Sequence, residues 1–501
     1  MGFSIAFISL SLSLAALTAA DLRGDLSGAG IRALLPGDDG YVVASGANNR
    51  RFALSPAAIA YPNSAEDVSQ IVIIGANIGL SVVARSGGHS YIANGLGGKD
   101  GALVVDLSNM TRISVDASSR FATIETGNRL GNVALGLNDQ GMAMPHGLCP
   151  HVGIGGHSAF GGWGWTSRMW GLTLDVIKAA NTVLPNGTTA RVTADNHPDL
   201  FWAIRGAAPS FGITTSVEVE TFAVPQHASI YSYSWDLTAD AAAQAFVDYQ
   251  SFVLDTTDLP PELGVSLTLT KSNTSGHVAF SLGGGWYGEP DKLDGVWKPL
   301  LDKLPDPASY ERMGNGTWMD AVEFGARVTG SSLDTLRMPS PSDLFYSKSL
   351  MTSEGSPSTG EAALSLMRYL SNEGFRSNLN WIIQIELVGG SNSRINAAPL
   401  NSTSYVRRDA LFTWHFRGVA PNNTASYPAE GYTFVDGAYN SVVGSMPSDW
   451  DYSAYVNYPD DRLQGWQERY YGGHYDRLKS IKRAIDPDNV FSFPTSIEVS
   501  E

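Results

Sequence analysis

The chain has 501 residues, of which 43% are hydrophobic and 10% aromatic, and its 33 Lys and Arg against 49 Asp and Glu give a formal charge of −16. This length and apolar content exceed what one hydrophobic core holds, so we expect two folded domains and no extensive disorder. The acidic balance argues against nucleic acid and anionic membrane as partners, because both are bound through basic surface. A small neutral or cationic molecule remains open as the ligand.

The N-terminal segment is apolar over residues 3–20, FSIAFISLSLSLAALTAA, and ends in small residues before Asp21. Its length and ending predict a cleaved signal peptide over residues 1–20. No other segment is long and apolar enough to span a bilayer. Six N-x-[ST] sequons agree with a secretory route, so we expect a secreted glycoprotein. Their asparagines are Asn109, Asn186, Asn273, Asn315, Asn401 and Asn422.

Short strands mix with helices in the first half of the chain. The predicted elements are, in order, a helix over 64–78, strands within 80–88, 101–108 and 121–127, a helix within 129–141, a hairpin around 181–193, a helix within 197–206 and a strand within 211–222. Ser64 begins the first helix, with Asp67 in the capping-box position. Asn186-Gly187 is a hairpin turn signal. This α+β mixture predicts one domain over residues 45–225.

Beyond residue 226 the pattern changes to strands of alternating polarity separated by helices. The predicted strands lie within 266–272, 277–288, 379–390 and 410–419, and a helix covers 360–372. This pattern predicts a second domain over residues 226–450, an antiparallel sheet backed by helices. The last segment, 451–501, is expected to be largely helical and to return to the first domain.

Two of these strands, at 380–387 and 411–417, place apolar and polar side chains at alternate positions, and so on opposite faces. The ordinary interpretation is a sheet with one solvated face. The alternative is a wall of polar groups facing a ligand cleft between the domains. The polar set is Gln384, Glu386, Thr413, His415 and Arg417, with Asn380 and Ile382 on the same face.

Cys149, the only cysteine of the chain, lies in HGLCPHVGIGGH at residues 146–157. A single cysteine cannot form an internal disulfide, so it is either an inert core residue or has a chemical use. The glycines around it would let the backbone approach a ligand and point N–H groups at phosphate oxygens. They do not form the dinucleotide fingerprint, because Ser158 stands where the third glycine belongs. GAGIRA at 28–33 matches that fingerprint, but no strand is predicted before it.

The histidines near Cys149 also permit a metal site. His146, His151 and His157 carry further ligand atoms, but sulfur occurs once and the spacing does not resemble a structural zinc site. A zinc centre would indicate a metal-dependent hydrolase; we expect no metal. His89, in RSGGHSY, has the ordinary interpretation of a histidine in a tight turn.

RSGGHSY (85–91) followed by GLCPHVGIGGHSAFGGWGW (147–165) resembles the flavin-binding region of the vanillyl-alcohol oxidase, or p-cresol methylhydroxylase, superfamily. Within it the chain is most similar to the berberine-bridge-enzyme-like branch, which includes fungal glucooligosaccharide and chito-oligosaccharide oxidases. The resemblance continues through DLFWAIRGAAPSFGI (199–213) and AYVNYPD (454–460) and covers nearly the whole mature chain. It implies an α+β fold of two domains, a PCMH-type FAD-binding domain and an antiparallel-sheet substrate domain.

The resemblance implies FAD as the cofactor, held by bonds from His89 to the 8α carbon and from Cys149 to C6 of the isoalloxazine. Oxidised flavin is electron-poor, and thiolate and neutral imidazole are nucleophiles that a protein can offer it. These bonds would explain why a lone cysteine is retained. The further FAD-binding residues that the resemblance implies are Arg85, Ser86, Gly87, Gly88, Ser90, Tyr91, Gly153, Gly155, Gly156, His157, Gly161, Gly162, Gly164, Ile213 and Asn457.

The same resemblance implies Tyr458, in YVNYPD, as the base that takes the proton of the substrate hydroxyl. A free phenol has a pKa near ~10, so its anion must be stabilised for it to act at neutral pH. Glu386 aligns with the acidic residue of the substrate strand and is implied to order Tyr458 or to bind a second hydroxyl. The implied substrate residues are Gln384, Ile382 and His415, and the last two depart from an aromatic residue and a glutamine in the oligosaccharide oxidases.

The function implied is that of a secreted, monomeric FAD-linked oxidoreductase that oxidises a hydroxyl-bearing carbon of a small molecule and is reoxidised by O2 to give H2O2. Two substrates remain open, the anomeric carbon of an oligosaccharide and a fungal-type secondary metabolite. A non-catalytic flavin-binding secreted protein is the alternative from another class.

Overall fold

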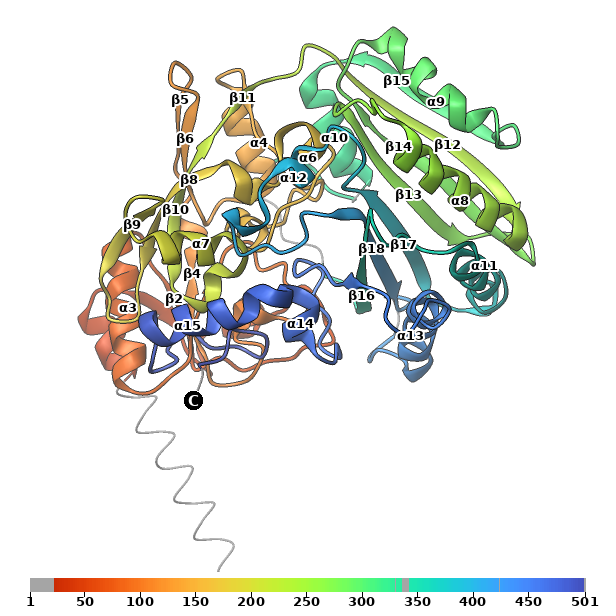
Figure 1. Ribbon diagram of the computed structural model, residues 1–501. Helices are drawn as coiled ribbons and strands as arrows, with labels where there is room; N and C mark the ends of the chain where they lie inside the picture. The colour runs from red at the N-terminus through yellow and green to blue at the C-terminus, as the bar shows by residue number, and fades with distance from the viewer. Residues whose placement is uncertain (1–21, 329, 336–341, 423, 500–501) are drawn as a thin grey trace, which may run out of the picture.

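The computed structural model describes residues 22–328, 330–335, 342–422 and 424–499 (Figure 1). The predicted signal peptide at residues 1–20 lies outside the described residues. The described chain folds into mixed and antiparallel sheets with helices packed on them, which confirms the predicted α+β fold.

The first sheet has four strands in the order β1 (Arg32–Leu34), β2 (Ala58–Tyr61), β4 (Leu103–Asp106) and β3 (Val82–Arg85). β2, β4 and β3 run parallel, and α3 (Ala65–Asn77) connects β2 to β3. Ser64 caps this helix by accepting the N–H of Asp67, whereas the Asp67 carboxylate accepts the N–H of Asn63 rather than completing a capping box with Ser64. Residues 22–28 are helical, so the GAGIRA segment follows a helix and not a strand.

The second sheet has five antiparallel strands. They are β5 (Ile113–Asp116), β6 (Phe121–Glu125), β10 (Ile213–Glu220), β8 (Ile177–Val183) and β9 (Thr189–Thr193), in that spatial order. The predicted hairpin joins β8 to β9, and Gly187 takes a φ of 81° in its turn, a conformation that glycine adopts without steric cost. α4 (Leu130–Asn138) and α7 (Pro198–Ala207) pack on this sheet through a shared apolar core.

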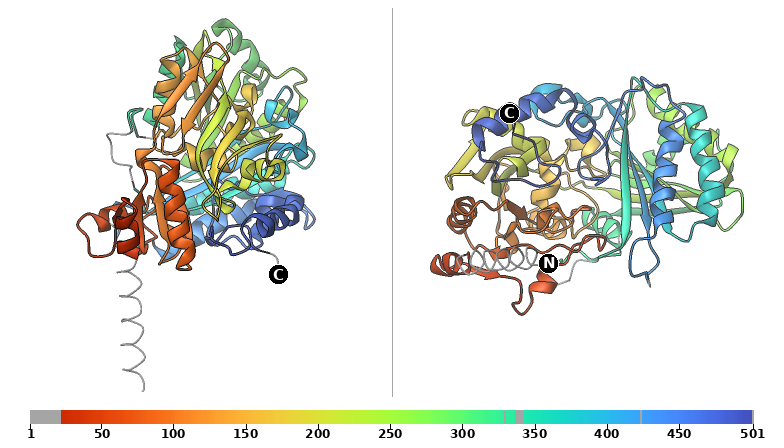
Figure 2. Two further views of the ribbon diagram at one scale, coloured as in Figure 1. Left: turned by 90° about the vertical axis from the view of Figure 1, so that its left-hand side faces the viewer. Right: turned by 90° about the horizontal axis from the view of Figure 1, so that it is seen from below.

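The third sheet has eight antiparallel strands and occupies the right of Figure 1. Its strands, in spatial order, are β15 (Ser309–Gly316), β12 (Ala228–Thr238), β14 (His277–Trp286), β13 (Leu263–Lys271), β17 (Asn380–Leu387), β18 (Ala410–Val419), β16 (Phe345–Ser353) and β19 (Tyr452–Ser453). α8 (Ala239–Asp255), α11 (Gly360–Tyr369) and α13 (Ala429–Val443) cover its outer face, burying an aromatic-rich core (Figures 1 and 2). The other face turns toward the N-terminal half of the chain.

Shorter elements connect these layers. They are α2 (Tyr41–Ala44), β7 (Met142–Ala143), α5 (Ile154–Ala159), α6 (Ser167–Trp170), β11 (Phe222–Ala223), α9 (Leu293–Leu301), α10 (Trp318–Val328) and α12 (Arg394–Ala397).

The C-terminal segment packs on the N-terminal half through α14 (Trp466–Tyr471) and α15 (Tyr475–Ile485) (Figure 1). Lys482 Nζ lies fully buried 2.6 Å from Asp486 Oδ2 and also donates to the carbonyls of Ser210 and Phe491. The bond from Lys482 to Ser210 fastens the tail to a loop 272 positions earlier in the chain, and Asp486 neutralises the buried ammonium.

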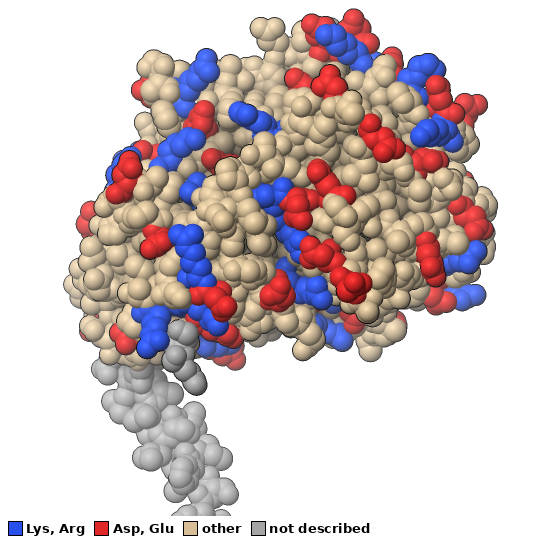
Figure 3. Space-filling model, viewed as in Figure 1, with Lys and Arg blue, Asp and Glu red and all other residues tan. Residues whose placement is uncertain are grey.

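None of the helices within the described ranges is long and apolar enough to cross a membrane. On the face shown in Figure 3, acidic and basic side chains are interspersed, so this face offers no continuous basic area.

Candidate active site

A cavity of about 530 Å³ lies where the inner face of β17 and β18 meets the glycine-rich loops and the C-terminal segment. Ile382, Gln384 and Glu386 of β17 and His415 and Arg417 of β18 line it. Their strand neighbours of opposite parity lie in the helix-covered core. The polar face predicted by alternation therefore borders a cavity, which favours the ligand-cleft interpretation over a solvated sheet face.

Two glycine loops form the opposite wall. Gly87 and Gly153 meet backbone to backbone, so that a Cβ on Gly87 would lie 2.3 Å from the Gly153 nitrogen. Ser86 ties the loops together, donating to the Thr126 carbonyl and accepting the N–H of Gly155. Only glycine allows this approach, and the result is a wall of main-chain atoms. The predicted FAD-binding residues that line the cavity here are Arg85, Ser86, Gly87, Gly88, Ser90, Tyr91, Gly153, Gly155, Gly156, His157 and Asn457.

Four residues predicted to bind the cofactor are not among those that line the cavity: Gly161, Gly162, Gly164 and Ile213. A Cβ on the glycines would meet Tyr455, Thr173 and the His146 carbonyl, so close packing between chain segments explains them. Ile213 is 1% exposed and points into the core of the first sheet. Its neighbours Gly212 and Thr214 reach the cavity instead, because side chains alternate along β10.

Arg85 lines the cavity, but its guanidinium is engaged with the protein. It forms an ion pair with Asp106 and donates to the Ala44 carbonyl at 2.5 Å. Arg85 thus contributes to the cavity wall with its charge paired at the end of β4, and its implied contact with FAD stays a prediction.

His89 and Cys149 meet at one end of the cavity, with Cys149 Sγ 3.7 Å from His89 Nε2. They come from segments 60 positions apart, so the fold brings them together. Burial, with Arg417 nearby, lowers the pKa of His89 to about 4, so its imidazole is neutral at physiological pH. A neutral imidazole beside a thiol gives this end of the cavity two nucleophiles.

The remaining histidines near Cys149 are tied to separate partners. His146 Nδ1 lies 2.9 Å from the Gly147 carbonyl, and His157 Nε2 accepts the Gly147 N–H at 3.0 Å. His151 Nδ1 lies 3.5 Å from Arg129. Over the part of the chain that is described, no three His, Cys, Asp or Glu residues gather to hold a metal ion.

Tyr458 and Glu386 face each other across the cavity. The Tyr458 hydroxyl donates to Glu386 Oε1 at 2.8 Å, while Glu386 Oε2 is buried without a partner. Burial raises the pKa of Glu386 to about 8, although the bond from Tyr458 opposes this shift. Burial and the carboxyl of Glu386 also raise the pKa of Tyr458 well above its usual value. Near neutral pH both groups therefore keep their protons, and the Glu386 carboxyl ionises before the Tyr458 hydroxyl as the pH rises.

The segment before Tyr458 is fixed by hydrogen bonds to the glycine loops. Tyr455 accepts the N–H groups of Gly162 and Trp163 at 2.9 and 3.1 Å. Asn457 donates to the His157 carbonyl at 2.9 Å. Asn457 therefore lines the cavity as predicted, and it acts by attaching the Tyr458 segment to α5.

Sequence reasoning did not assign Arg417, Asp343 or Phe345 to the site, yet all three line the cavity. Arg417 donates to Asp343 at 2.7 Å, and its guanidinium carbon lies 4.4 Å from the centre of the Phe345 ring. Strand alternation placed Arg417 on the polar face, so its position in the cavity lining could have been predicted from the sequence. Nothing in the sequence pointed to Asp343, which lies outside any strand.

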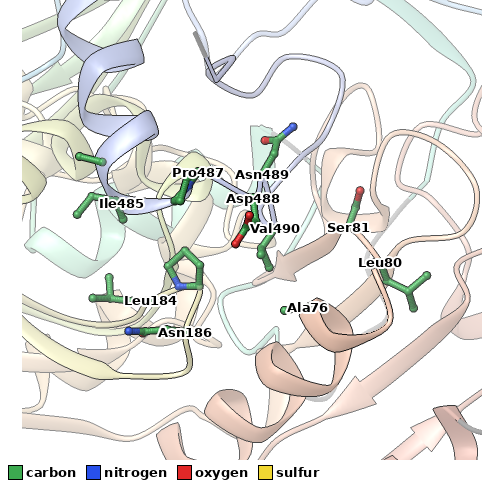
Figure 4. Close-up of a pocket in the computed structure, with 13 residues that line it drawn as sticks. Ala76, Leu80, Ser81, Leu184, Asn186, Ile485, Pro487, Asp488, Asn489 and Val490 are labelled. Atoms are coloured by element: carbon green, nitrogen blue, oxygen red, sulfur yellow. The ribbon is translucent and has the colours of Figure 1, made fainter. Parts of the chain in front are cut away.

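A second hollow, of about 570 Å³, lies between the end of α3, the β8–β9 hairpin and the residues after α15 (Figure 4). Asp488 is the only ionisable residue in its lining, which also includes Leu80, Leu184 and Ile485. It offers no paired catalytic groups, so the cavity beside Tyr458 is the candidate active site.

Two family models match the chain. The FAD binding domain matches residues 56–193, and the berberine and berberine-like model matches residues 454–498. The first match contains His89 and Cys149, and the second contains Tyr458.

Curated relatives match the chain over most of its length. A xylooligosaccharide oxidase of Thermothelomyces thermophilus is 35% identical, over 90% of this chain and 89% of its own. A chitooligosaccharide oxidase of Gibberella zeae is 33% identical, with the same coverage of 90% and 89%. The FAD-linked oxidoreductase dpmaF of Metarhizium anisopliae is 32% identical over 90% of this chain and 86% of its own.

Solved structures agree with these matches. A chitooligosaccharide oxidase superposes with a TM-score of 0.89 at 31% identity, covering 96% of this chain and 100% of its own. The glucooligosaccharide oxidase of Acremonium strictum, described with a 6-S-cysteinyl, 8α-N1-histidyl FAD, superposes with a TM-score of 0.87 at 30% identity, covering 96% and 99%.

Proposed function

The chain belongs to the berberine-bridge-like family of FAD-linked oxidoreductases, and on this premise we propose that it oxidises a hydroxyl-bearing carbon of a saccharide, the anomeric carbon of an oligosaccharide. The observation that carries the proposal is the Tyr458–Glu386 hydrogen bond of 2.8 Å in the same cavity as His89 and Cys149. A proton acceptor thus faces the place where a covalently held cofactor would lie.

The residues present fit FAD. His89 and Cys149 are the two side chains that would attach the ring, and both are nucleophiles in their unprotonated forms. The main-chain wall around Gly87 and Gly153 would take the phosphate part, since a side chain at either position would collide with the facing loop. When bound, FAD supplies an acceptor for the two electrons that leave the substrate carbon, and O2 would reoxidise it to give H2O2.

The side chains around the substrate would hold and move its proton. The Tyr458 oxygen takes the proton of the substrate hydroxyl as the carbon is oxidised, while the proton of Tyr458 passes along its hydrogen bond to the carboxylate form of Glu386. Glu386 Oε1 orients that phenol by accepting the hydrogen bond from its hydroxyl. Glu386 Oε2, which has no protein partner, is available for a second substrate hydroxyl. The buried setting excludes water from the proton transfer.

A second substrate class rests on Ile382. This aliphatic side chain lines the cavity partly buried and cannot give a pyranose the stacking surface of an aromatic ring. One relative, dpmaF, is named only as an FAD-linked oxidoreductase. A secondary-metabolite alcohol is therefore the alternative substrate.

Secretion and a monomeric state are further parts of the proposal. The sequon asparagines whose burial the structure describes are all exposed, which supports a glycosylated protein: Asn109, Asn186, Asn273, Asn401 and Asn422. The division into domains at 45–225, 226–450 and 451–501 also stays a proposal.

The test is anaerobic mixing of purified protein with oligosaccharides of glucose, xylose and N-acetylglucosamine. Rapid bleaching of the flavin by one class would establish a saccharide oxidase and identify its sugar. A yellow protein that no saccharide bleaches would rule out this substrate class in favour of a secondary metabolite or a non-catalytic flavoprotein.

In the active protein, Tyr458→Phe is expected to slow flavin reduction at least ~10²-fold, the usual contribution of a general base. FAD should remain attached, because Tyr458 is not an attachment residue. Near-normal reduction by this variant would contradict the assignment of the base.

A further inference from the structure

The ring of Tyr458 lies among three other rings. His415 stacks on it with centroids 4.2 Å apart and planes 18° from parallel. Tyr91 lies parallel at 6.0 Å, and Tyr455 meets the ring edge-on at 5.2 Å. His415 is the nearest of the three and the only one in close face contact.

His415 is itself held rigidly. It lies on β18, an interior strand of the sheet, is 3% exposed, and its Nε2 lies 2.9 Å from the Ser347 hydroxyl on β16. β-Strand pairing fixes its backbone on both sides, opposite Gln384 of β17 and Ser349 of β16. The imidazole plane is therefore set by the sheet and by one side-chain bond.

Tyr458, by contrast, lies on a segment without regular structure between β19 and α14. Its hydroxyl is fixed by the single bond to Glu386, and its main chain by the bond from its N–H to the Tyr455 carbonyl at 2.9 Å. One hydrogen bond fixes the position of the phenol oxygen relative to Glu386 but leaves the plane of the ring free to rotate. The imidazole of His415, stacked on the face of the ring, restricts this rotation.

The imidazole adds no charge to the site. Burial, with Arg417 nearby, lowers the pKa of His415 to about 3, so the ring is neutral across the working range. Its contact with Tyr458 is therefore one of shape and dispersion, unlike the charged contact that a protonated histidine would make.

We propose that His415 is a positioning residue for Tyr458, which holds the phenol ring in the plane that keeps its oxygen on Glu386 and toward the substrate, and that Ser347 fixes His415 for this task. This assignment gives His415 a role beside the substrate contact that the resemblance implies for it, which stays a prediction. It rests on the proposed function only in naming Tyr458 as the base; the ring contact itself does not depend on the substrate.

Two substitutions distinguish the effect of the His415 ring from the effect of its hydrogen bond to Ser347. His415→Gln keeps a polar group near Ser347 and removes the flat ring, whereas His415→Phe keeps a ring and removes the bond. His415→Gln is expected to lower the rate of flavin reduction at saturating substrate by ~10 to 100-fold with KM changed less than ~3-fold, as for a misaligned catalytic group. His415→Phe should recover most of that loss. Thr352→Val, a buried hydroxyl without a partner on the same sheet, is the control and should behave as the wild type.

A readout independent of activity is the 19F NMR signal of 3-fluorotyrosine placed at position 458. Ring stacking should shift this signal in the wild-type and His415→Phe proteins, and His415→Gln should move it toward the value of the free amino acid. A signal unchanged by His415→Gln, or a change in KM with the saturating rate intact, would overturn the proposal. If no saccharide reduces the wild-type flavin, the proposed substrate class fails, but the NMR result still decides the ring contact.

Discussion

At the scale of single residues, Glu386 has the most consequential environment. It is 4% exposed, it accepts the Tyr458 hydroxyl, and burial raises its pKa to about 8. Below that pH the carboxyl is protonated and cannot accept a proton; above it the carboxylate can. The ability of Tyr458 to act as a base therefore depends on pH through the ionisation of Glu386.

The rate of flavin reduction is accordingly expected to rise as the pH passes through about 8. Glu386→Gln should flatten this step, because an amide does not titrate. Stability should change in the opposite sense: the folded state keeps the proton that an unfolded glutamate loses near pH 4.5, so the free energy of unfolding falls between pH 4.5 and about 8. Stopped-flow reduction and urea unfolding across this range check both effects. A step of equal size in Glu386→Gln would assign it to another group.

The attachment residues give a second prediction at this scale. Cys149→Ser is expected to leave FAD bound to acid-precipitated protein through His89 with a shifted visible spectrum. The double variant with His89→Ala should release all of its FAD on precipitation. The measurement is flavin absorbance in pellet and supernatant. Complete release from Cys149→Ser alone would show that His89 forms no bond.

The residues of the cavity with nucleophilic or acid-base side chains were predictable from sequence motifs, since Cys149, His89 and Tyr458 each lie in a distinctive local pattern. Asp343 and Phe345 were not, because their place in the site depends on how a distant loop crosses the sheet. Gly161, Gly162 and Ile213 were placed at the cofactor by motif, and the structure uses them for packing. A motif marks a stretch of chain, whereas side-chain direction within it depends on local geometry.

At the scale of elements, α6 is joined to the substrate sheet through one side chain. Arg168 is 1% exposed and donates to main-chain carbonyls from two separate loops. These acceptors are Leu259, Pro260, Leu263, Gly389 and Ser391. No carboxylate pairs with it among these contacts, so its guanidinium serves as a planar clamp between layers.

Arg168→Met should therefore leave several buried carbonyls without a hydrogen-bond donor and lower the free energy of unfolding by about 3 kcal/mol or more. Arg191→Met, which breaks only the exposed pair with Glu218, is the matched control and should change stability by less than about 1 kcal/mol. Urea unfolding monitored by tryptophan fluorescence compares the two. Equal small losses would argue against the clamp.

Strands β17 and β18 were predicted to within a few residues because one face is apolar and the other polar. β16 was missed, since all nine of its residues are buried and its sequence shows no alternation. A strand that is buried on both faces need not alternate between polar and apolar residues, so its sequence alone does not identify it as a strand.

At the scale of the whole molecule, the active site depends on the attachment of the C-terminal segment. Tyr458 lies on the same C-terminal segment as α15, which Lys482 fastens to the first half of the protein by donating to the Ser210 carbonyl while Asp486 neutralises its charge.

Asp486→Asn is expected to leave the Lys482 ammonium buried without a countercharge and to cost about 3 to 5 kcal/mol of stability. Combining it with Lys482→Met should restore part of the loss, because no buried charge then remains. Thermal unfolding and residual flavin reduction after mild heating measure this. Wild-type stability in Asp486→Asn would show that the tail is held by its apolar contacts alone.

The order of the site residues along the chain also bears on biosynthesis. His89 and Cys149 leave the ribosome early, Glu386 much later, and Tyr458, Phe493 and Thr495 later still. A nascent chain therefore presents a thiol and an imidazole long before the pocket that would align a flavin with them exists. Attachment of a flavin inside the complete cavity requires a chain that has been made and folded as far as Thr495.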